Sequence, residues 1–539
     1  MKNTEKNGMK IAGIISSHDC SFAVLEDGKP IVHAELERYI RLKEPKGDAY
    51  KFLTEEYADF KDIKYFAHPL DIWRGGPSKW YPDSWNEIKK ITEQNDGKLF
   101  FVGHHKCHAA NAFFSSNMKD ALIITIDGGG TDLKNNEPKT STITVWEGKD
   151  NKIEEIEIIE EAEINIGSMW SYCTERIFGL SRGYPKGNQC GTVMAMACMG
   201  DPNVYYDEFY NHRCVHPNYK FFDFEKFKMI AERSEEDRFN VAAALQKSTE
   251  DIVKEVLNPF IKNTKSKNLC LSGGVVLNSV MTGKLTFDWY REQFDKVYVC
   301  PVPYDAGLAI GAAQYIWHQH LNNPRIEWED NFTPYLGFTY DEEQIQNAIK
   351  AKNNLVTTQS ATKRQVAELL ADSNIISVFS AGSESGRRAL GNRSILADPR
   401  NPDMKDIINK KVKHRQWFRP FAPSILREKV SEWFKHDISS PYMSFVVPFK
   451  EEVRDKVPAV VHFDGTARLQ TVTENDNKWY YNFLKTWEEV SGVPIVLNTS
   501  FNDREPIVET PEHAINCFLK TDIDYLYFAD CDLLVSKND

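Results

Sequence analysis

The sequence predicts a mixed α/β protein with two domains, of which the first contains two related units. Apolar segments of strand length alternate with longer helical segments through residues 10–320. One arrangement of strand, polar turn, strand and hairpin begins at residue 10 and occurs again from residue 121. A polar, proline-containing stretch at residues 322–339 then indicates a linker to a second domain.

The repeated arrangement is best seen element by element. The first copy has a strand at residues 10–16, a turn at 17–21, and strands at 22–25 and 30–33 around the hairpin turn Asp27-Gly28-Lys29. The second has a strand at 121–127, a turn at 128–132, and a strand at 141–146 before Glu147-Gly148-Lys149. The similarity of the two hairpins could be a coincidence. Otherwise it predicts two related α/β units that face each other across a cleft, as in actin-like and hexokinase-like nucleotide-binding folds.

The remaining elements complete both domains. They are a helix at 235–262, a strand at 269–272, a strand at 297–302, a helix at 308–317 and, beyond the linker, a helix at 342–352. We therefore place the domains at residues 1–340 and 341–539.

Composition restricts the classes of function. The net charge of −12 and the pI near 5.7 argue against general binding to nucleic acid or to an anionic membrane. No apolar segment approaches the ~20 residues that span a bilayer, and the N-terminus lacks the apolar core of a secretory signal. The ten cysteines form no CxxC pair, which favours reduced thiols. We expect a soluble cytoplasmic enzyme.

Two histidines and two aspartates form a candidate metal site. His104 and His108 are four residues apart, so a helix would present both imidazoles on one face. Asp127 and Asp305 each follow a predicted buried strand. Mixed nitrogen and oxygen ligands suit Fe(II), Zn(II) or Mn(II). Asp305 taken alone could instead cap a helix.

Glycine-rich turns after strands form a second pattern. They are Asp127-Gly128-Gly129-Gly130, Ser272-Gly273-Gly274 and Asp305-Ala306-Gly307. Glycines at strand ends let the phosphates of a nucleotide approach backbone N–H groups, and a following helix adds a favourable dipole. Together the three turns indicate a site for a nucleotide and a metal.

The second domain contains a strongly basic stretch. From Arg387 to Arg419 there are ten Lys or Arg residues and three Asp, a charge of +7 in an acidic chain. The arginines alternate with Gly, Leu, Trp, Phe and Pro, which favours a cleft over a solvated surface. Planar guanidinium groups suit bidentate phosphate binding, so the stretch predicts a site for a small polyanion. Arg468 and the segment Asn498–Asn502 add further polar groups.

These residues together resemble the NodU/CmcH family of ATP-dependent O-carbamoyltransferases, whose motifs run in order over nearly the whole chain. In the first domain the motifs are Ser17-His18-Asp19-Cys20-Ser21, Glu37-Arg38, His104-His105-x-x-His108-Ala, Asp127-Gly, Ser272-Gly-Gly-x-x-Leu-Asn278 and Asp305-Ala-Gly. In the second they are Gly386-Arg-Arg-Ala-Leu-Gly-Asn-Arg-Ser394, Lys413, Arg419-Pro-Phe-Ala-Pro423 and Leu497-Asn498-Thr-Ser500-Phe501.

The resemblance implies an actin-like N-terminal domain (ASKHA type, a duplicated RNase H-like fold) and a smaller YrdC-like α/β domain. In the family, the YrdC-like domain makes carbamoyl-adenylate from carbamoyl phosphate and ATP. The N-terminal domain then transfers the carbamoyl group to a hydroxyl beside a metal, commonly iron. The implied cofactors are ATP with Mg²⁺, carbamoyl phosphate as co-substrate, and Fe(II) or another divalent metal.

The resemblance also implies roles for particular residues. The metal ligands would be His104, His108, Asp127 and Asp305, and His18 would be the general base at the transfer site. The groups that hold carbamoyl phosphate and ATP would be Arg388, Lys413, Arg419, Arg468, Asn498 and Ser500. The adenylate contacts would be Gly128, Gly129, Gly273, Gly274 and Asn278.

The chain departs from the family pattern at three positions. Glu44 ends the pattern Arg38-Tyr-Ile-Arg41-Leu-Lys43-Glu44 where the family has His, Thr192 stands for Lys, and Arg387 stands for Pro. None of the three is a predicted metal ligand, and the departures at Glu44 and Thr192 bear on the acceptor or the nucleotide.

The acceptor is expected to be a small hydroxylated molecule such as a sugar or an antibiotic. Aromatic residues that could stack on it, or belong to the core, are Trp73, Trp80, Trp85, Trp170 and Tyr184. No nucleic-acid or membrane partner is expected, and a homodimer is possible although no motif indicates one. The alternatives are transfer to nitrogen, a different acyl-adenylate, a nucleotide-gated binding protein, or a kinase or ATPase.

Overall fold

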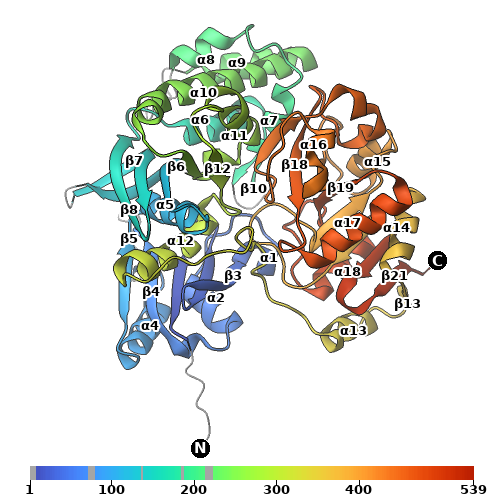
Figure 1. The fold of residues 1–539 in the computed structure, drawn as a ribbon, viewed down its shortest axis with the longest axis horizontal. Coiled ribbons are helices and arrows are strands. Elements are labelled where there is room, and N and C mark those ends of the chain that lie inside the picture. The colour runs from blue at the N-terminus through green and yellow to red at the C-terminus, as the bar shows by residue number, and fades with distance from the viewer. Residues whose placement is uncertain (1–7, 71–78, 135–136, 184–186, 213–221, 539) are drawn as a thin grey trace, which may run out of the picture.

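A computed structural model describes residues 8–70, 79–134, 137–183, 187–212 and 222–538. The chain forms two five-stranded sheets and one nine-stranded sheet. The five-stranded sheets lie in the half coloured from blue to yellow-green in Figure 1, and the nine-stranded sheet lies in the orange and red half. The structure is therefore mixed α/β, as predicted.

The two five-stranded sheets share one topology. The first contains β1 (Lys10–Ile15), β2 (Ser21–Glu26), β3 (Lys29–Glu35), β4 (Ile63–Pro69) and β5 (Lys98–Val102), in the order β3-β2-β1-β4-β5. The second contains β6 (Asp120–Lys134), β7 (Glu137–Lys149), β8 (Lys152–Glu160), β11 (Asn268–Ser272) and β12 (Lys296–Val299), in the order β8-β7-β6-β11-β12. In each, the first three strands pair antiparallel and the last two join parallel. This duplication confirms the predicted actin-like, RNase H-like plan.

Alternation along the strands places helices on both faces of the first sheet. Ile11 and Ile15 pack with α12 (Leu308–Tyr315), whereas Ala12 and Ile14 pack with α2 (Ala49–Glu56). Helix α5 (His104–Phe114) contacts α12 and also covers the second sheet, so it lies between the two units. The other helices of this half are α1 (Leu36–Ile40), α4 (Pro82–Gln94), α6 (Ile166–Tyr172), α7 (Cys190–Ala197), α8 (Tyr206–His212), α9 (Phe224–Arg233), α10 (Glu235–Asn263) and α11 (Ser279–Lys284).

One predicted turn is wrong. Residues 128–132 continue β6 instead of ending it, and the pairing with β7 shifts register between Ile126 and Gly130. This is a β-bulge, whose extra residues and glycine content give the same sequence signal as a turn. The bulge matters because Asp127, a predicted metal ligand, lies in it, between the paired residues Ile126 and Gly130.

The second half is built on one mixed sheet. Its strands are β13 (Val356–Ser360), β14 (Ile376–Phe379), β15 (Arg393–Ala397), β16 (Ala422–Leu426), β17 (Phe445–Pro448), β18 (Thr466–Val472), β19 (Ile495–Ser500), β20 (Tyr525–Phe528) and β21 (Leu533–Lys537). Their order is β13-β21-β20-β14-β15-β19-β16-β18-β17. The helices are α13 (Glu342–Lys350), α14 (Lys363–Ala371), α15 (Met404–Lys411), α16 (Val430–Trp433), α17 (Lys478–Ser491) and α18 (Pro511–Lys520). The predicted linker, residues 322–339, contains neither helix nor strand.

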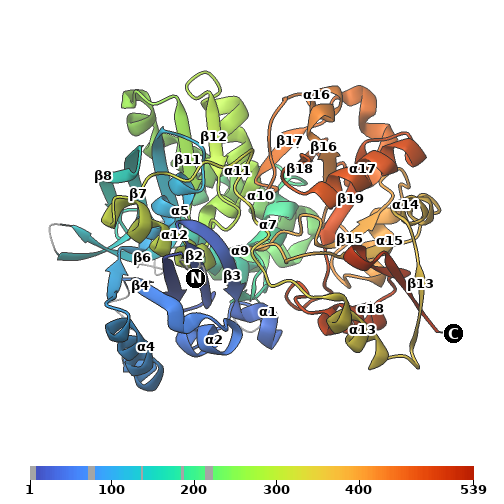
Figure 2. The same cartoon turned by 60° about the horizontal axis from the view of Figure 1, so that its bottom comes forward.

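Buried polar contacts join the two halves near α1, which lies at their boundary in both views (Figures 1 and 2). Arg38 donates to the Gly386 carbonyl at 2.6 Å, and the Gly386 N–H donates to Glu35 at 2.8 Å. Arg38 also lies 3.6 Å from Glu509. Within the described ranges, no helix combines the length and apolar character that a membrane crossing requires.

Candidate active site

The four predicted metal ligands converge between the two sheets. Helix α5 presents the imidazoles of His104 and His108, Asp127 comes from the bulge in β6, and Asp305 follows β12. One ligand atom of each residue lies within 4.8 Å of the others. The Asp127 carboxylate is 3.0 Å from His104 Nε2 and 3.3 Å from His108 Nε2. The Asp305 carboxylate lies 3.7 Å from His104 Nε2 and 3.6 Å from His108 Nε2, so it belongs to this cluster.

The cluster is buried, and its imidazoles and carboxylates offset one another's charge. Burial alone would raise the pKa of Asp127, but hydrogen bonds from His104 and His108 outweigh it and hold that pKa well below its usual range. Burial would likewise lower the pKa of His108, yet its contacts with Asp127 and Asp305 raise that pKa to about 9. Each imidazole therefore has a strong partner in the cluster.

Neighbouring groups orient these ligands. The Ser272 hydroxyl lies 3.2 Å from the Pro303 carbonyl and 3.4 Å from His108 Nδ1. Because the hydroxyl donates to the carbonyl, it accepts the Nδ1–H of His108 and leaves Nε2 facing the carboxylates. The Gly274 N–H donates to Asp127 Oδ1 at 3.0 Å. Two imidazoles and two carboxylates with such outer contacts fit a divalent transition metal.

A cavity of about 290 Å³ opens beside the cluster. His104, Asp305, Gly128 and Gly129 line it together with His18. The His18 imidazole is 47% exposed and its Nε2 lies 3.1 Å from Asp305 Oδ2. The structure thus brings the predicted general base, two predicted metal ligands and two predicted adenylate contacts to one cavity. Its volume is near the lower end for ligand pockets.

The other predicted adenylate contacts have structural roles of their own. Gly273 has φ of +99°, and a Cβ there would lie 2.1 Å from the Ile126 carbonyl oxygen, so only glycine fits. The Asn278 side chain accepts from the N–H of Met281 at the start of α11 and exchanges hydrogen bonds with Gln246. Contact of these residues with an adenylate stays a prediction.

The cations of the second half form a separate cluster around β16, β18 and β19. Arg388, Arg419 and Arg468 are partly buried, and the described residues place no carboxylate within 4.0 Å of their guanidinium groups. Burial lowers the pKa of Arg468 well below its usual range, and the charges of Arg388, Arg415 and Arg419 lower it further. Burial also lowers the pKa of Arg388, to about 10.

Lys413, Ser500 and Asn498 complete this region. The Lys413 ammonium, buried at 3% exposure, donates to Asn502 Oδ1 at 2.7 Å, and it also contacts the Ser500 hydroxyl at 3.4 Å. Asn498, in the middle of β19, is buried and donates to the Ala389 carbonyl at 3.1 Å. Positive charge without a local counter-charge marks a site for an anion, because an unpaired buried charge is costly.

Other arginines of the basic stretch, unlike those of the cation cluster, have carbonyl or carboxylate partners within the protein. Arg393 is fully buried, and its guanidinium donates to the carbonyls of Ser380 and Ala381. Arg400 forms an ion pair with Asp398 at 2.6 Å. Arg387 pairs with Asp19 and Glu44, each at 2.8 Å. Two departures from the family pattern, Glu44 and Arg387, are thus partners of each other.

The aromatic residues named as possible acceptor contacts fall into two groups, those that line the cavity and those that belong to the core. Trp80 lines the cavity, whereas Trp85 packs against Tyr50. Trp170 is buried and donates to Thr249 at 2.8 Å, so it belongs to the core. Trp73 and Tyr184 lie outside the described residues.

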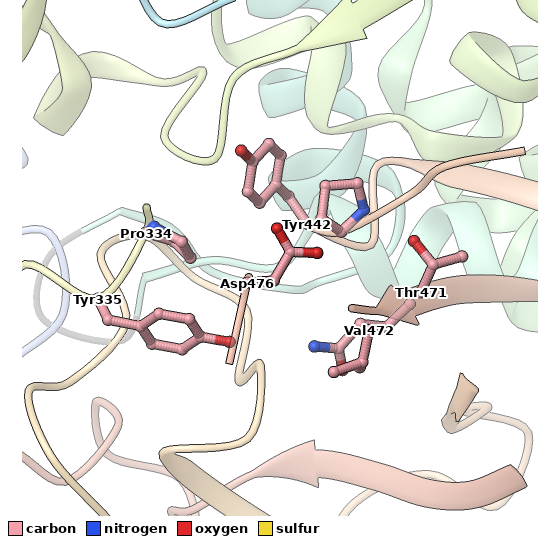
Figure 3. Close-up of a pocket in the computed structure, with 8 residues that line it drawn as sticks. Pro334, Tyr335, Tyr442, Thr471, Val472 and Asp476 are labelled. Carbon is pink, nitrogen blue, oxygen red and sulfur yellow. The ribbon is translucent and has the colours of Figure 1, made fainter. Parts of the chain in front are cut away.

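A second, much smaller cavity lies between the linker and the nine-stranded sheet (Figure 3). Tyr335, Tyr442 and Asp476 are among its lining residues, and its volume is about 10 Å³. That is room for about one water molecule, so it holds no substrate.

Sequence comparison agrees with this arrangement. Sequence models of the carbamoyltransferase N-terminus and C-terminus match residues 81–314 and 367–536. The nodulation protein NolO of Bradyrhizobium diazoefficiens is 33% identical, over 79% of this chain and 77% of its own. An uncharacterized protein of Synechocystis is 30% identical over 94% of both chains.

Among solved structures, the HypF protein of T. kodakarensis superposes with a TM-score of 0.39 and 14% identity, over 59% of this chain and 48% of that one. Superposition at this level carries no inference about fold or activity. The two matching sequence models and the relatives of similar length decide the classification: the chain is a transferase enzyme that belongs to the carbamoyltransferase family.

Proposed function

We propose that this protein makes carbamoyl-adenylate from carbamoyl phosphate and ATP, and transfers the carbamoyl group to a hydroxyl of a small molecule. The observation that carries the proposal is the cluster of unpaired cations in the second half. Arg388, Arg419 and Arg468 need an anion to balance their charge, and carbamoyl phosphate and ATP are both rich in phosphate oxygens.

The chemistry requires two steps. In the first, water cleaves carbamoyl phosphate to carbamate and inorganic phosphate, and a carbamate oxygen then attacks the α-phosphorus of ATP, so that pyrophosphate leaves. The guanidinium groups and the Lys413 ammonium would stabilise the negative charge that develops there. Linking the carbamoyl group to AMP provides a good leaving group. We assign this step to residues 341–539, the part of the chain that we expect to be YrdC-like, with Mg²⁺ on the nucleotide.

The second step takes place in the cavity beside the His/Asp cluster. His18 would accept the proton of the acceptor hydroxyl, because its imidazole lines the cavity. Gly128 and Gly129 would leave room for the adenylate. A divalent metal such as Fe(II), held by His104, His108, Asp127 and Asp305, would supply electrostatic polarisation. A cavity of about 290 Å³ suits a small hydroxylated acceptor, and Trp80 offers a face for stacking.

The test is product analysis with purified protein, ATP and Mg²⁺, with and without carbamoyl phosphate. We expect AMP and pyrophosphate only when carbamoyl phosphate is present. ADP as the sole product would indicate a kinase or ATPase, and no turnover by folded, iron-loaded protein would contradict the proposal. Parallel screens with hydroxylated and amine acceptors separate transfer to oxygen from transfer to nitrogen.

A further inference from the structure

The loop that follows α1 is held against the second half of the protein at two points. On one side, Arg41 donates to the carbonyls of Pro506 and Ile507 at 2.5 and 2.8 Å. On the other, the Glu44 carboxylate pairs with Arg387 at 2.8 Å. Lys43 lies between these two contacts, so the docking of the two halves fixes its place.

The Glu44 side of the loop is rigid. Its carboxylate also accepts the N–H of Asn188 at 2.7 Å, and its own N–H donates to Glu37 at 3.1 Å. The partner Arg387 is itself held by Asp19 at 2.8 Å and stacks over the Tyr304 ring at 4.4 Å. A loop anchored in this way presents Lys43 in one direction.

The Lys43 ammonium has no hydrogen bond or ion pair with any described residue, although the side chain is partly buried. Its stem packs on Gly187, where a Cβ would lie 2.8 Å from Lys43 Cδ. Burial lowers the pKa of Lys43; Glu37 opposes this, and the charges of Arg387 and Arg419 add to it. Contacts place the loop beside the Lys413 end of the cation cluster: Arg41 lies 3.5 Å from Glu505, and the Glu505 carbonyl accepts from Asn502, which in turn accepts from Lys413.

Lys43 in turn affects the pKa of Lys413 in the second half. The pKa of Lys413 is held well below its usual range, mainly by burial, and the charges of Arg415, Lys43 and Arg419 contribute. A lysine from the first half thus joins a cluster that already lacks counter-charge. The salt bridges nearby are made by its neighbours Arg41 and Glu44, not by Lys43.

We propose that Lys43 is a ligand of the phosphate-bearing anion that the cation cluster of the second half binds. The anion site is then composite, and is complete only when the two halves are docked through Arg41 and Glu44. The inference rests on the proposed function for the identity of the anion as carbamoyl phosphate or ATP. Because binding and docking are linked, the anion also stabilises the contact between the halves.

The experiment measures binding of carbamoyl phosphate and of pyrophosphate to the full chain by calorimetry at constant ionic strength. Lys43→Met keeps the length of the stem and removes the charge, so we expect affinity to fall about tenfold. Lys43→Arg should retain most of the affinity. Lys46→Met is the matched control, because Lys46 is exposed on the same loop.

Thermal unfolding without anion separates a ligand from a structural residue. An unpaired, partly buried ammonium does not stabilise the apo protein, so Lys43→Met should unfold at the wild-type temperature or above it. Wild-type affinity in Lys43→Met would overturn the inference. Lowered affinity together with a lower unfolding temperature and no recovery in Lys43→Arg would overturn it too. If the wild-type protein binds neither anion, the proposed function fails instead.

Discussion

The protein contains two buried clusters of charged side chains, and they differ in whether each positive group has a carboxylate partner. In the first half, His104 and His108 lie within hydrogen-bonding distance of a carboxylate, at 3.0 and 3.3 Å from Asp127. In the second half, Arg388 and Arg419 have no carboxylate partner among the residues that the structure describes. One cluster contains its own counter-charges and the other does not.

The difference follows from the chemistry of the side chains. An imidazole can take up a proton to balance a carboxylate, and the raised pKa of His108, about 9, reflects this. A guanidinium group cannot lose its proton in a protein, so only an added anion can balance the second cluster. The first cluster can therefore release protons when it binds a metal ion, whereas the second can be neutralised only by a bound anion such as phosphate.

The largest effect is expected from removing one unpaired guanidinium. Arg419→Ala should reduce carbamoyl-phosphate-dependent AMP formation by at least about 100-fold, because one charge that balances the phosphates is lost. The measurement is AMP release at saturating ATP. Arg400→Ala is the control, since Arg400 is paired with Asp398 at 2.6 Å and should leave the rate near the wild-type value. Normal AMP formation in Arg419→Ala would show that the cluster is not the adenylation site.

Removing a member of the paired cluster should separate the two steps. His108→Ala should lower the affinity for Fe(II) or Co(II) by more than about 100-fold, while adenylate formation, seen as pyrophosphate release, continues. The measurements are metal content after gel filtration and pyrophosphate release by the same sample. The exposed His320 provides the control variant His320→Ala. Full metal occupancy in His108→Ala would refute the ligand assignment.

Binding of an anion to the unpaired cluster should also increase the free energy of unfolding of the protein. Pyrophosphate at about 100 times its dissociation constant should stabilise the protein by about 2.7 kcal/mol, which corresponds to a shift of about 2 °C in the unfolding midpoint of a chain of 539 residues. The shift should be absent in Arg419→Ala and unchanged in Arg400→Ala. Equal shifts in all three proteins would mean that the anion binds elsewhere.

Sequence alone predicts the common face of the two histidines, because local geometry determines it. The spacing of His104 and His108 fixes that face on α5, whereas Asp127, in the bulge of β6, and Asp305, after β12, reach it through the fold of the second sheet. The bulge between Ile126 and Gly130 contains glycines, as turns do, which is why the sequence predicts a turn at residues 128–132.

Sequence did not separate the paired cations of the second half from the unpaired ones. Arg388 and Arg393 belong to one motif, yet Arg393 donates to carbonyls in the core and Arg388 has no such partner among the residues that the structure describes. The pairing of Glu44 with Arg387 joins residues on different domains. Both outcomes depend on tertiary docking, which leaves no local pattern in the chain.

The smallest predicted effect concerns the orientation of a ligand. Ser272→Ala removes the hydroxyl that accepts the Nδ1–H of His108 at 3.4 Å, so that imidazole would no longer be held with Nε2 toward the carboxylates. We expect about a tenfold loss of metal affinity, at the lower end for an outer-shell contact, with AMP formation unchanged. Ser279→Ala is the control, because Ser279 is also buried and its hydroxyl has no partner among the described residues. A metal affinity equal to that of the wild type would mean that Asp127 and Asp305 alone orient His108, and that the paired cluster needs no support from β11.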